Sequence, residues 1–218
     1  LSRATSCSSH PTFAVMNWDT NTIMFDSLPA EKWATCEWRD LPEVLREKPL
    51  IEYLIVWHHK TELGGLENLP SLPGLKYLEL NWSNARDLRG IENLASLKRL
   101  ELHYCVKLES DTGVDAAKEH LEFIHINQAK KFVCDGALAS LRELRVLRLN
   151  SCGPISSLEF VLGYPTLEDF RFVGTNIVDG KLLPLMNHPS LKSVGMSNKR
   201  HYSHKDRTIQ EALSRKRR

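Results

Sequence analysis

The chain has 218 residues, with 29 Lys or Arg against 27 Asp or Glu, and 42% of its residues are hydrophobic. This length suits one domain with a sizeable core, and the ordinary composition excludes a disordered, collagen-like or coiled-coil chain. No apolar run reaches the ~18 residues that a membrane span needs, and the polar first ten residues are unlike a signal peptide. Five Cys without a CxxC pair indicate neither a disulfide framework nor a zinc ribbon. We therefore expect free thiols and a cytoplasmic protein.

The first fifty residues differ in pattern from the rest. We expect residues 1–10 to be a flexible leader or a segment added to the chain, and residues 11–50 to form an N-terminal cap. Residues 13–18 and 22–26 are strand-like and are joined by a turn sequence, which predicts a hairpin.

The second half of this cap is expected to be helical. Residues 29–38 begin with Pro and continue with helix formers, which favours a capped helix, and residues 41–45 are expected to begin another. Trp33 and Trp38 are expected to contribute to the core of the cap.

A regular apolar pattern begins at residue 51. Three apolar anchors with the spacing LxxLxL recur seven times, at steps of 24, 22, 24, 23, 23 and 24 residues. The anchors are Ile51-Leu54-Val56, Leu75-Leu78-Leu80, Leu97-Leu100-Leu102, Leu121-Ile124-Ile126, Leu144-Leu147-Leu149, Leu167-Phe170-Phe172 and Leu191-Val194-Met196. The last two anchors of each set share one face of a strand, and one repeat cannot bury that face alone. The pattern therefore predicts stacked repeats that share one core.

This spacing resembles that of the leucine-rich repeat family, over roughly residues 50–200. The family usually has Asn at the ninth position of LxxLxLxxN, but this chain has His59, Ser83, Cys105, Ala129, Cys152, Thr175 and Lys199 there. We expect the usual ladder of buried side-chain amides to be weakened or replaced. The resemblance implies an α/β solenoid in which residues 51–198 form about seven repeats. It also implies a parallel concave sheet and a convex side of 3₁₀ helices, short helices and irregular turns.

The segments between the strands are expected to cross the convex side. Their Pro and Gly residues favour short 3₁₀ or irregular turns over long helices. Residues 111–121 and 135–144 are expected to form short helices, because each begins with Asp and continues with Ala and Leu.

The last twenty residues, 199–218, carry eight Lys or Arg against two acids, whereas the rest of the chain has a net charge of −4. This basic C-terminal cap or tail has two interpretations: a contact for nucleic acid or another anionic surface, or a solvated helix. His201 and His204 lack the Glu of a metalloprotease motif, and we expect Tyr202 to pack on the end of the core.

Between the anchors, residues are expected to point onto the concave face. The row between the second and third anchors is Ile55, Glu79, Glu101, His125, Arg148, Arg171 and Gly195. The residues just before the second anchor and just after the third anchor are expected to point the same way. In the first four repeats these positions and the next one beyond the strand would expose Tyr53, Trp57, Tyr77, Trp82, Tyr104 and Phe123, with Arg99 among them. Because interface hot spots are enriched in Trp, Tyr and Arg, this cluster predicts a protein-binding surface. The alternative is that some of these aromatic rings pack on one another across the strands.

A catalytic site or a metal site on the same face is an alternative to a protein-binding surface. Glu79 and Glu101 would lie side by side with His125 next to them, which suits acid–base chemistry or a metal site completed by the His. An open strand face, however, does not exclude water. His103 and His125 without a third placed ligand are a weak metal signal. Phosphate-binding and nucleophile-elbow motifs do not occur. We expect no catalysis, no cofactor and no metal.

We therefore predict a non-enzymatic protein-binding module that uses its concave face and does not enter a membrane. The predicted contact residues are Tyr53, Trp57, Tyr77, Glu79, Asn81, Trp82, Arg99, Glu101, His103, Tyr104, Phe123, His125, Arg148 and Arg171. The resemblance further implies a bacterial-type intracellular protein, with toxin-neutralising immunity proteins and inhibitors as examples. The alternatives are a nucleic-acid-associated factor that acts through the basic tail and an adaptor or effector subunit of an enzyme.

Overall fold

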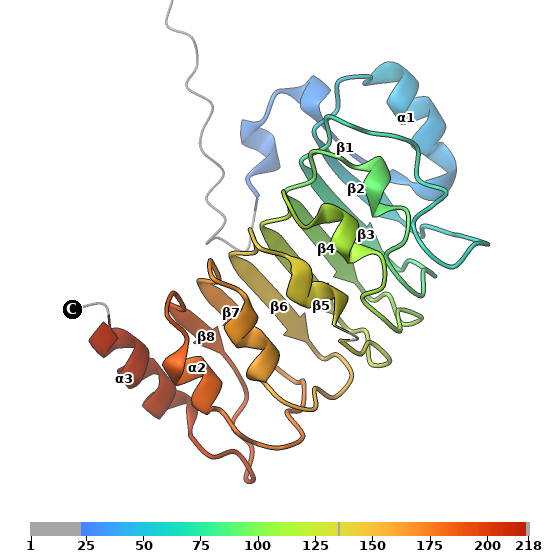
Figure 1. Cartoon of the computed structure of the whole chain (residues 1–218). Helices are drawn as coiled ribbons and strands as arrows, with labels where there is room; N and C mark the ends of the chain where they lie inside the picture. The colour runs from blue at the N-terminus through green and yellow to red at the C-terminus, as the bar shows by residue number, and fades with distance from the viewer. Residues whose placement is uncertain (1–22, 135, 217–218) are drawn as a thin grey trace, which may run out of the picture.

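The computed structural model describes residues 23–134 and 136–216. Within these ranges, eight strands form one parallel sheet in which the strands follow one another in chain order (Figure 1). The strands are β1 (Trp33–Glu37), β2 (Tyr53–Trp57), β3 (Tyr77–Asn81), β4 (Arg99–His103), β5 (Phe123–Asn127), β6 (Val146–Asn150), β7 (Asp169–Arg171) and β8 (Ser193–Gly195). The predicted solenoid with a parallel sheet is therefore confirmed.

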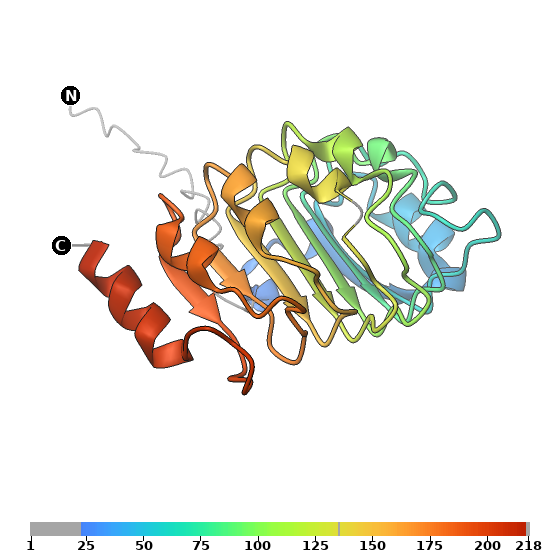
Figure 2. The same cartoon turned by 60° about the horizontal axis from the view of Figure 1, so that its bottom comes forward.

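Several connections between the strands carry short helical segments on the side opposite the concave face (Figure 2), whereas Phe25–Ser27 and Ala30–Lys32 precede β1. The 3₁₀ segments are Phe25–Ser27, Ala30–Lys32, Trp38–Asp40, Ile91–Asn93, Val114–Ala117, Ala137–Ser140 and Glu159–Gly163, and the α-helices are α1 (Leu41–Glu47), α2 (Leu183–Asn187) and α3 (Asp206–Lys216). Val114–Ala117 and Ala137–Ser140 lie where short helices were predicted. The expected 3₁₀ and short-helix convex side is confirmed.

The strand register follows the apolar anchors. Leu54 pairs with Leu78 and Leu78 with Leu100, and the same alignment continues to Val194 in β8. Leu54, Leu78 and Leu100 have no exposed surface, so each repeat buries its anchors against its neighbours.

Three glycines at regular spacing explain why the convex segments begin where they do. Gly90, Gly113 and Gly136 each precede a 3₁₀ segment with φ between +93° and +106°. This left-handed conformation is strained for residues with a side chain. At Gly90, a Cβ atom would also collide with the backbone of Leu66 and Glu67 in the preceding repeat.

At three of the ninth positions, Cys105, Cys152 and Thr175, a small hydrogen-bond donor replaces the expected Asn. The Thr175 hydroxyl donates to the Leu149 carbonyl oxygen over 2.6 Å. The thiols of Cys105 and Cys152 lie 3.6 and 3.4 Å from carbonyl oxygens of the preceding strand, and burial raises the pKa of each thiol to about 12. The side chains of Cys105, Cys152 and Thr175 thus each donate to a carbonyl oxygen of the preceding strand and link neighbouring repeats.

The N-terminal predictions need correction. Residues 13–18 lie outside the described part of the chain, and the described part of 22–26 contains the start of the 3₁₀ segment Phe25–Ser27 instead of a strand. The helix predicted over 29–38 is wrong, because its second half is β1, which pairs in parallel with β2. Ala34 and Cys36 take the anchor positions of β1, so pairing with a sheet edge overrides helix propensity. Helix α1 begins at Leu41, as expected.

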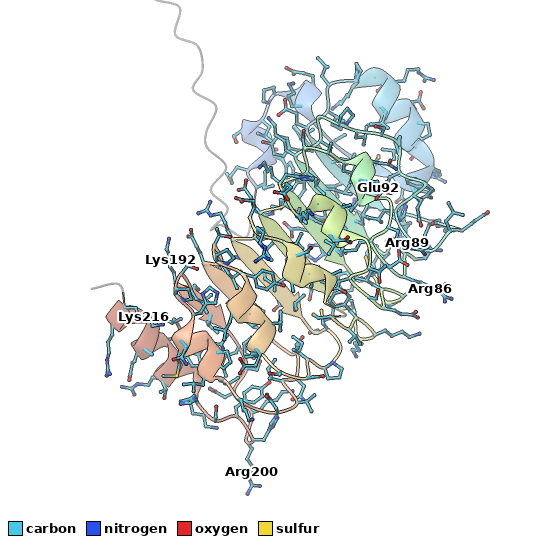
Figure 3. All side chains as sticks on the ribbon, in the orientation of Figure 1. Arg86, Arg89, Glu92, Lys192, Arg200 and Lys216 are labelled. Atoms are coloured by element: carbon cyan, nitrogen blue, oxygen red, sulfur yellow. The ribbon has the colours of Figure 1, made fainter. Side chains whose placement is uncertain are left out.

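The C-terminal segment covers the end of the core. Ile209 and Leu213 of α3 are buried, and the Gln210 amide donates to the Val194 carbonyl of β8 over 2.6 Å. Tyr202 is buried and its hydroxyl accepts a hydrogen bond from the Ile177 backbone, which confirms its predicted packing. Arg200 projects away from this end of the solenoid (Figure 3). None of the helices formed by residues 23–134 and 136–216 has the length and apolar character of a membrane span.

Candidate functional site

The concave face carries side chains in the rows that the sequence predicted. Glu79 pairs with Ile55 on one side and with Glu101 on the other, and His125, Arg148 and Arg171 continue this row. We call the side chains that strands β2 to β7 direct onto this face the concave floor. The aromatic rim is Trp57 together with the residues that immediately follow β2, β3 and β4, which are His58, Trp82 and Tyr104.

Several floor residues that were predicted to be exposed are buried. Tyr53, Tyr77, Arg99 and Phe123 are at most 8% exposed. The predicted open aromatic patch is therefore wrong for these four residues, and the alternative of packing across strands holds for them.

Contacts across the sheet account for part of this burial. The Arg99 guanidinium lies 3.8 Å from the centre of the Phe123 ring, and the rings of Tyr53 and Tyr77 are 6.4 Å apart. Phe25, from the segment before β1, packs edge-on against Tyr77 with ring centres 5.6 Å apart. Adjacent strands are only about 4.8 Å apart, so large side chains in one row cover each other.

Glu101 is the centre of a buried polar network. Its Oε1 accepts a hydrogen bond from Arg99 Nε over 2.7 Å, and its Oε2 lies 3.0 Å from His103 Nε2 and 3.3 Å from His125 Nδ1. Burial alone would raise the pKa of Glu101, but the hydrogen bonds with both His and the charge of Arg99 outweigh it and hold the pKa well below its usual range. Glu101 is therefore ionised at neutral pH and is not a proton donor there.

Glu79 has its own set of donors. The Tyr77 hydroxyl donates to Oε2 over 2.5 Å, and the Asn81 amide donates to Oε1 over 2.7 Å. Burial, followed by the charges of Glu101 and Glu79, raises the pKa of the Tyr77 hydroxyl. The two carboxylates predicted to lie side by side do so, and the Tyr77 hydroxyl lies between them, 2.5 Å from Glu79 Oε2 and 3.4 Å from Glu101 Oε1. Each carboxylate also has donors that the other lacks, which does not favour proton sharing between them.

The second half of the floor contains another charge cluster. Asp169 Oδ2 accepts hydrogen bonds from Arg148 Nη2 over 2.7 Å and from Arg171 Nε over 3.1 Å. Arg148 is 2% exposed, whereas Arg171 is partly exposed. Asp169 is not among the predicted contact residues, because the sequence does not indicate which carboxylate neutralises the two arginines.

A hollow of about 600 Å³ lies over the middle of the floor. Its lining includes Glu101, His103, His125, Asn150 and Arg171. Burial lowers the pKa of His125, so its imidazole is neutral at physiological pH.

The aromatic rim differs from the floor in its exposure. Trp82 and Tyr104 are 47% and 46% exposed, and His58 is exposed as well. The Trp82 ring centre lies 5.2 Å from that of His58 with an interplanar angle of 11°, and 5.6 Å from that of Tyr104 with an angle of 29°. Trp57 lies 5.3 Å from Trp82 on the floor side. The rim is thus a stacked, solvent-facing series of rings.

Backbone geometry fixes the rim in place. His58, Trp82 and Tyr104 have φ values of +55°, +54° and +57°, which are uncommon for large side chains. Each backbone N–H donates to the carbonyl oxygen at the end of the next strand, over 2.8 to 2.9 Å. Gln128 and Ser151 take the same conformation after β5 and β6, so it is a feature of the repeat that also holds the rim residues in place.

One group of side chains on the floor has the composition of a metal site. One donor atom from each of Glu101, His103 and His125 lies within 4.8 Å of the other two. The sequence pattern gave His103 and His125 no third ligand, and the structure places the Glu101 carboxylate between the two imidazoles.

Comparisons with solved structures bear on the fold. The leucine-rich repeat domain of the type III effector XopL is 14% identical over 80% of this chain, with a TM-score of 0.53. The chain has the leucine-rich repeat fold. It spans 63% of the length of that XopL domain.

A second structure that resembles this leucine-rich repeat solenoid is internalin C2 from Listeria monocytogenes. It is 20% identical, with 71% of this chain and 75% of that chain aligned and a TM-score of 0.44. No protein-family model matches the sequence, and no curated protein matches it.

Proposed function

We propose that this leucine-rich repeat solenoid is a non-enzymatic module that binds another protein through the aromatic rim and the adjoining floor. The exposed stack of His58, Trp82 and Tyr104 carries the proposal. Exposed aromatic clusters of this size are uncommon on a surface without a partner, and Trp and Tyr supply much of the energy at protein interfaces.

The charge of the floor favours a protein over a nucleic acid as the partner. Strands β3 to β7 place three carboxylates and three guanidinium groups on this face, namely Glu79, Glu101, Asp169, Arg99, Arg148 and Arg171. Single-stranded nucleic acids stack on aromatic residues too, but they need a groove with net positive charge. A floor with balanced charge next to an apolar rim resembles the mixed chemistry of protein interfaces.

The basic C-terminal segment supports a nucleic-acid function only weakly. Helix α3 buries Ile209 and Leu213 against the last repeats, so its first role is to cover the core. Its solvent-facing residues include Arg207, which is paired with Glu211 over 2.9 Å. Deleting the segment would damage the fold, so reversing the charge of exposed Lys205 and Arg215 is the better test. Salt-dependent binding to nucleic acid that these reversals abolish would favour the alternative.

The rim is tested by photo-crosslinking in the cells that produce the protein. A photoreactive phenylalanine at position 104 should capture a specific protein, and the same residue at position 162, on the convex side, should not. Leu162 is a matched control, because it is 43% exposed and belongs to the segment Glu159–Gly163.

Quantitative binding to the captured protein then follows. Trp82→Ala with Tyr104→Ala should weaken binding at least tenfold, because these residues form the exposed stack, whereas Leu162→Ala should leave it unchanged. Equal affinity of the rim variant and the wild type would contradict the proposal.

Finer assignments are part of the same proposal. A toxin-neutralising immunity protein or inhibitor in the cytoplasm is the specific role that we propose, and an adaptor subunit is the alternative. Among the described residues, Cys36, Cys105, Cys134 and Cys152 form no disulfide, which suits a reducing compartment. An inhibitor would abolish an activity of the captured protein, whereas an adaptor would leave it intact.

A further inference from the structure

Two neighbouring strands place three metal-ligating side chains on the concave floor. Glu101 and His103 are two residues apart on β4, so their side chains share one face of the sheet. His125 is the direct register partner of Glu101 on β5. The register of the sheet therefore brings the three groups together without any loop, which favours a preorganised arrangement.

The distances from Glu101 to the two imidazoles suit a tetrahedral metal ion, and the donor atoms of His103 and His125 lie within 4.8 Å of each other. Glu101 Oε2 lies 3.0 Å from His103 Nε2 and 3.3 Å from His125 Nδ1. Ligand atoms at about 2.0–2.1 Å from Zn²⁺ in tetrahedral geometry are about 3.3 Å apart. We propose that Glu101, His103 and His125 bind a divalent transition-metal ion of the Zn²⁺ class, a site that revises the expectation of no metal.

The surroundings of the triad support this site. Arg99 holds the other carboxylate oxygen of Glu101, which fixes the orientation of the carboxylate although its positive charge opposes the cation. The carboxylate of Glu79 lies in the same row and offsets that charge.

The fourth coordination position faces the hollow. Glu101, His103 and His125 all line this space of about 600 Å³, which leaves room for a water molecule or another ligand on the metal. Three protein ligands with an open position are typical of zinc sites that exchange a ligand, in contrast to closed structural sites.

Asn150 sets the tautomer of His125 and offers a way to test ligation. The Val173 N–H donates to Asn150 Oδ1 over 3.0 Å, so Asn150 Nδ2 faces His125 Nε2 at 3.1 Å and donates to it. The imidazole proton then lies on Nδ1. A metal at Nδ1 moves this proton to Nε2, where a hydrogen-bond acceptor is needed.

Asn150→Asp supplies that acceptor. The Asp side chain can still accept the Val173 N–H, and its second oxygen can accept the His125 Nε2–H, as in the carboxylate–histidine–zinc arrangement. We expect this variant to bind Zn²⁺ about tenfold to a hundredfold more tightly than the wild type. An unchanged or weaker affinity would overturn ligation through Nδ1.

The main experiment titrates ZnCl₂ into the chelator-treated full chain by calorimetry and follows Co²⁺ by its visible absorption. We expect one ion per chain, with the strong visible bands of tetrahedral Co²⁺. His103→Gln and His125→Gln should each weaken binding at least tenfold, because each removes a ligand atom, while the Gln amide preserves a hydrogen-bond donor toward Glu101. Circular dichroism and the melting temperature check that the variants fold.

His58→Gln is the matched control. His58 Nδ1 also lies against a carboxylate, 2.9 Å from Glu37 Oε2, but this pair is on the exposed rim and is not part of the triad. The control should retain wild-type affinity. The proposal is overturned if the wild type binds no Zn²⁺, or if the double variant of His103 and His125 binds as tightly as the wild type.

Discussion

The concave floor and the aromatic rim come from the same strands and their ends, yet they differ in exposure to solvent. Floor side chains such as Arg99 and Glu101 point away from the apolar core and are nevertheless buried, with their charges paired. One residue beyond the strand end, Trp82 and Tyr104 are nearly half exposed. Orientation relative to the sheet therefore does not determine exposure, since neighbouring rows cover the floor but leave the rim open.

If the floor is a buried network, removing one of its charges has the largest effect on stability. Arg99→Ala leaves the Glu101 carboxylate without its guanidinium partner, and the cost of breaking a buried ion pair is about 3–5 kcal/mol. Urea unfolding followed by circular dichroism measures this loss in the free energy of unfolding.

The matched control is Arg171→Ala, in the same floor row as Glu101. The Arg171 side chain is 36% exposed, and Asp169 keeps its bond with Arg148 when Arg171 is removed. The expected loss is below about 1 kcal/mol. Equal losses for the two variants would show that the floor is not divided into buried and solvated charges.

Low pH should lower the free energy of unfolding, because it protonates Glu101. The folded-state pKa of this carboxyl is held below its unfolded value of about 4.3, so its contribution to stability is fully present above that pH. The contribution is lost as the pH falls from there toward the folded pKa. Unfolding free energies of the wild type and Glu101→Gln should therefore differ most at neutral pH and converge in acid. A gap that stays constant from pH 7 to pH 3 would contradict this.

Glycine substitutions at the left-handed positions after the strands should change stability least, and the sign of the change should depend on the side chain that is removed. Gln128 continues the left-handed series with φ +62° but lies outside the aromatic stack. Gln128→Gly relieves strain of about 1 kcal/mol, which the extra entropy of Gly in the unfolded chain partly offsets. A small rise in melting temperature is expected.

Trp82→Gly relieves the same strain but also removes the stacking contacts with His58 and Tyr104. Aromatic pairs contribute about 0.5–1.5 kcal/mol each, so this variant should be no more stable than the wild type. If both glycine variants were stabilised equally, the stack would contribute nothing to the fold.

The sequence predicts the repeats and their register well. A purely apolar periodicity assigns β2 to β8 and places Glu79, Glu101 and His125 in one row, because parallel pairing of identical repeats leaves a single consistent alignment. Strand β1 was not predicted, because Ala34 and Cys36 are small compared with the Leu and Ile anchors of the repeats and the residues around them favour a helix.

Exposure and partners on the floor are harder to predict. The pattern indicates which way Tyr77 and Phe123 point, but not what covers them. The Tyr77 ring packs against Tyr53 and against Phe25, which comes from outside the repeats. The Phe123 ring is covered by the guanidinium groups of Arg99 and Arg148. The use of Glu101 as the group between two imidazoles likewise depends on the side-chain conformations of all three residues, and spacing alone does not supply these.

The parallel register of β4 and β5 has a consequence for how the chain tolerates rearrangement. All three proposed metal ligands lie within two consecutive repeats, and each repeat contacts mainly its neighbours. Duplicating a whole repeat beyond β6 would lengthen the solenoid, and deleting one would shorten it, and both would leave the triad intact. Inserting a repeat between β4 and β5 would separate His125 from Glu101 and His103. The length of the solenoid can thus change while the three proposed metal ligands stay together.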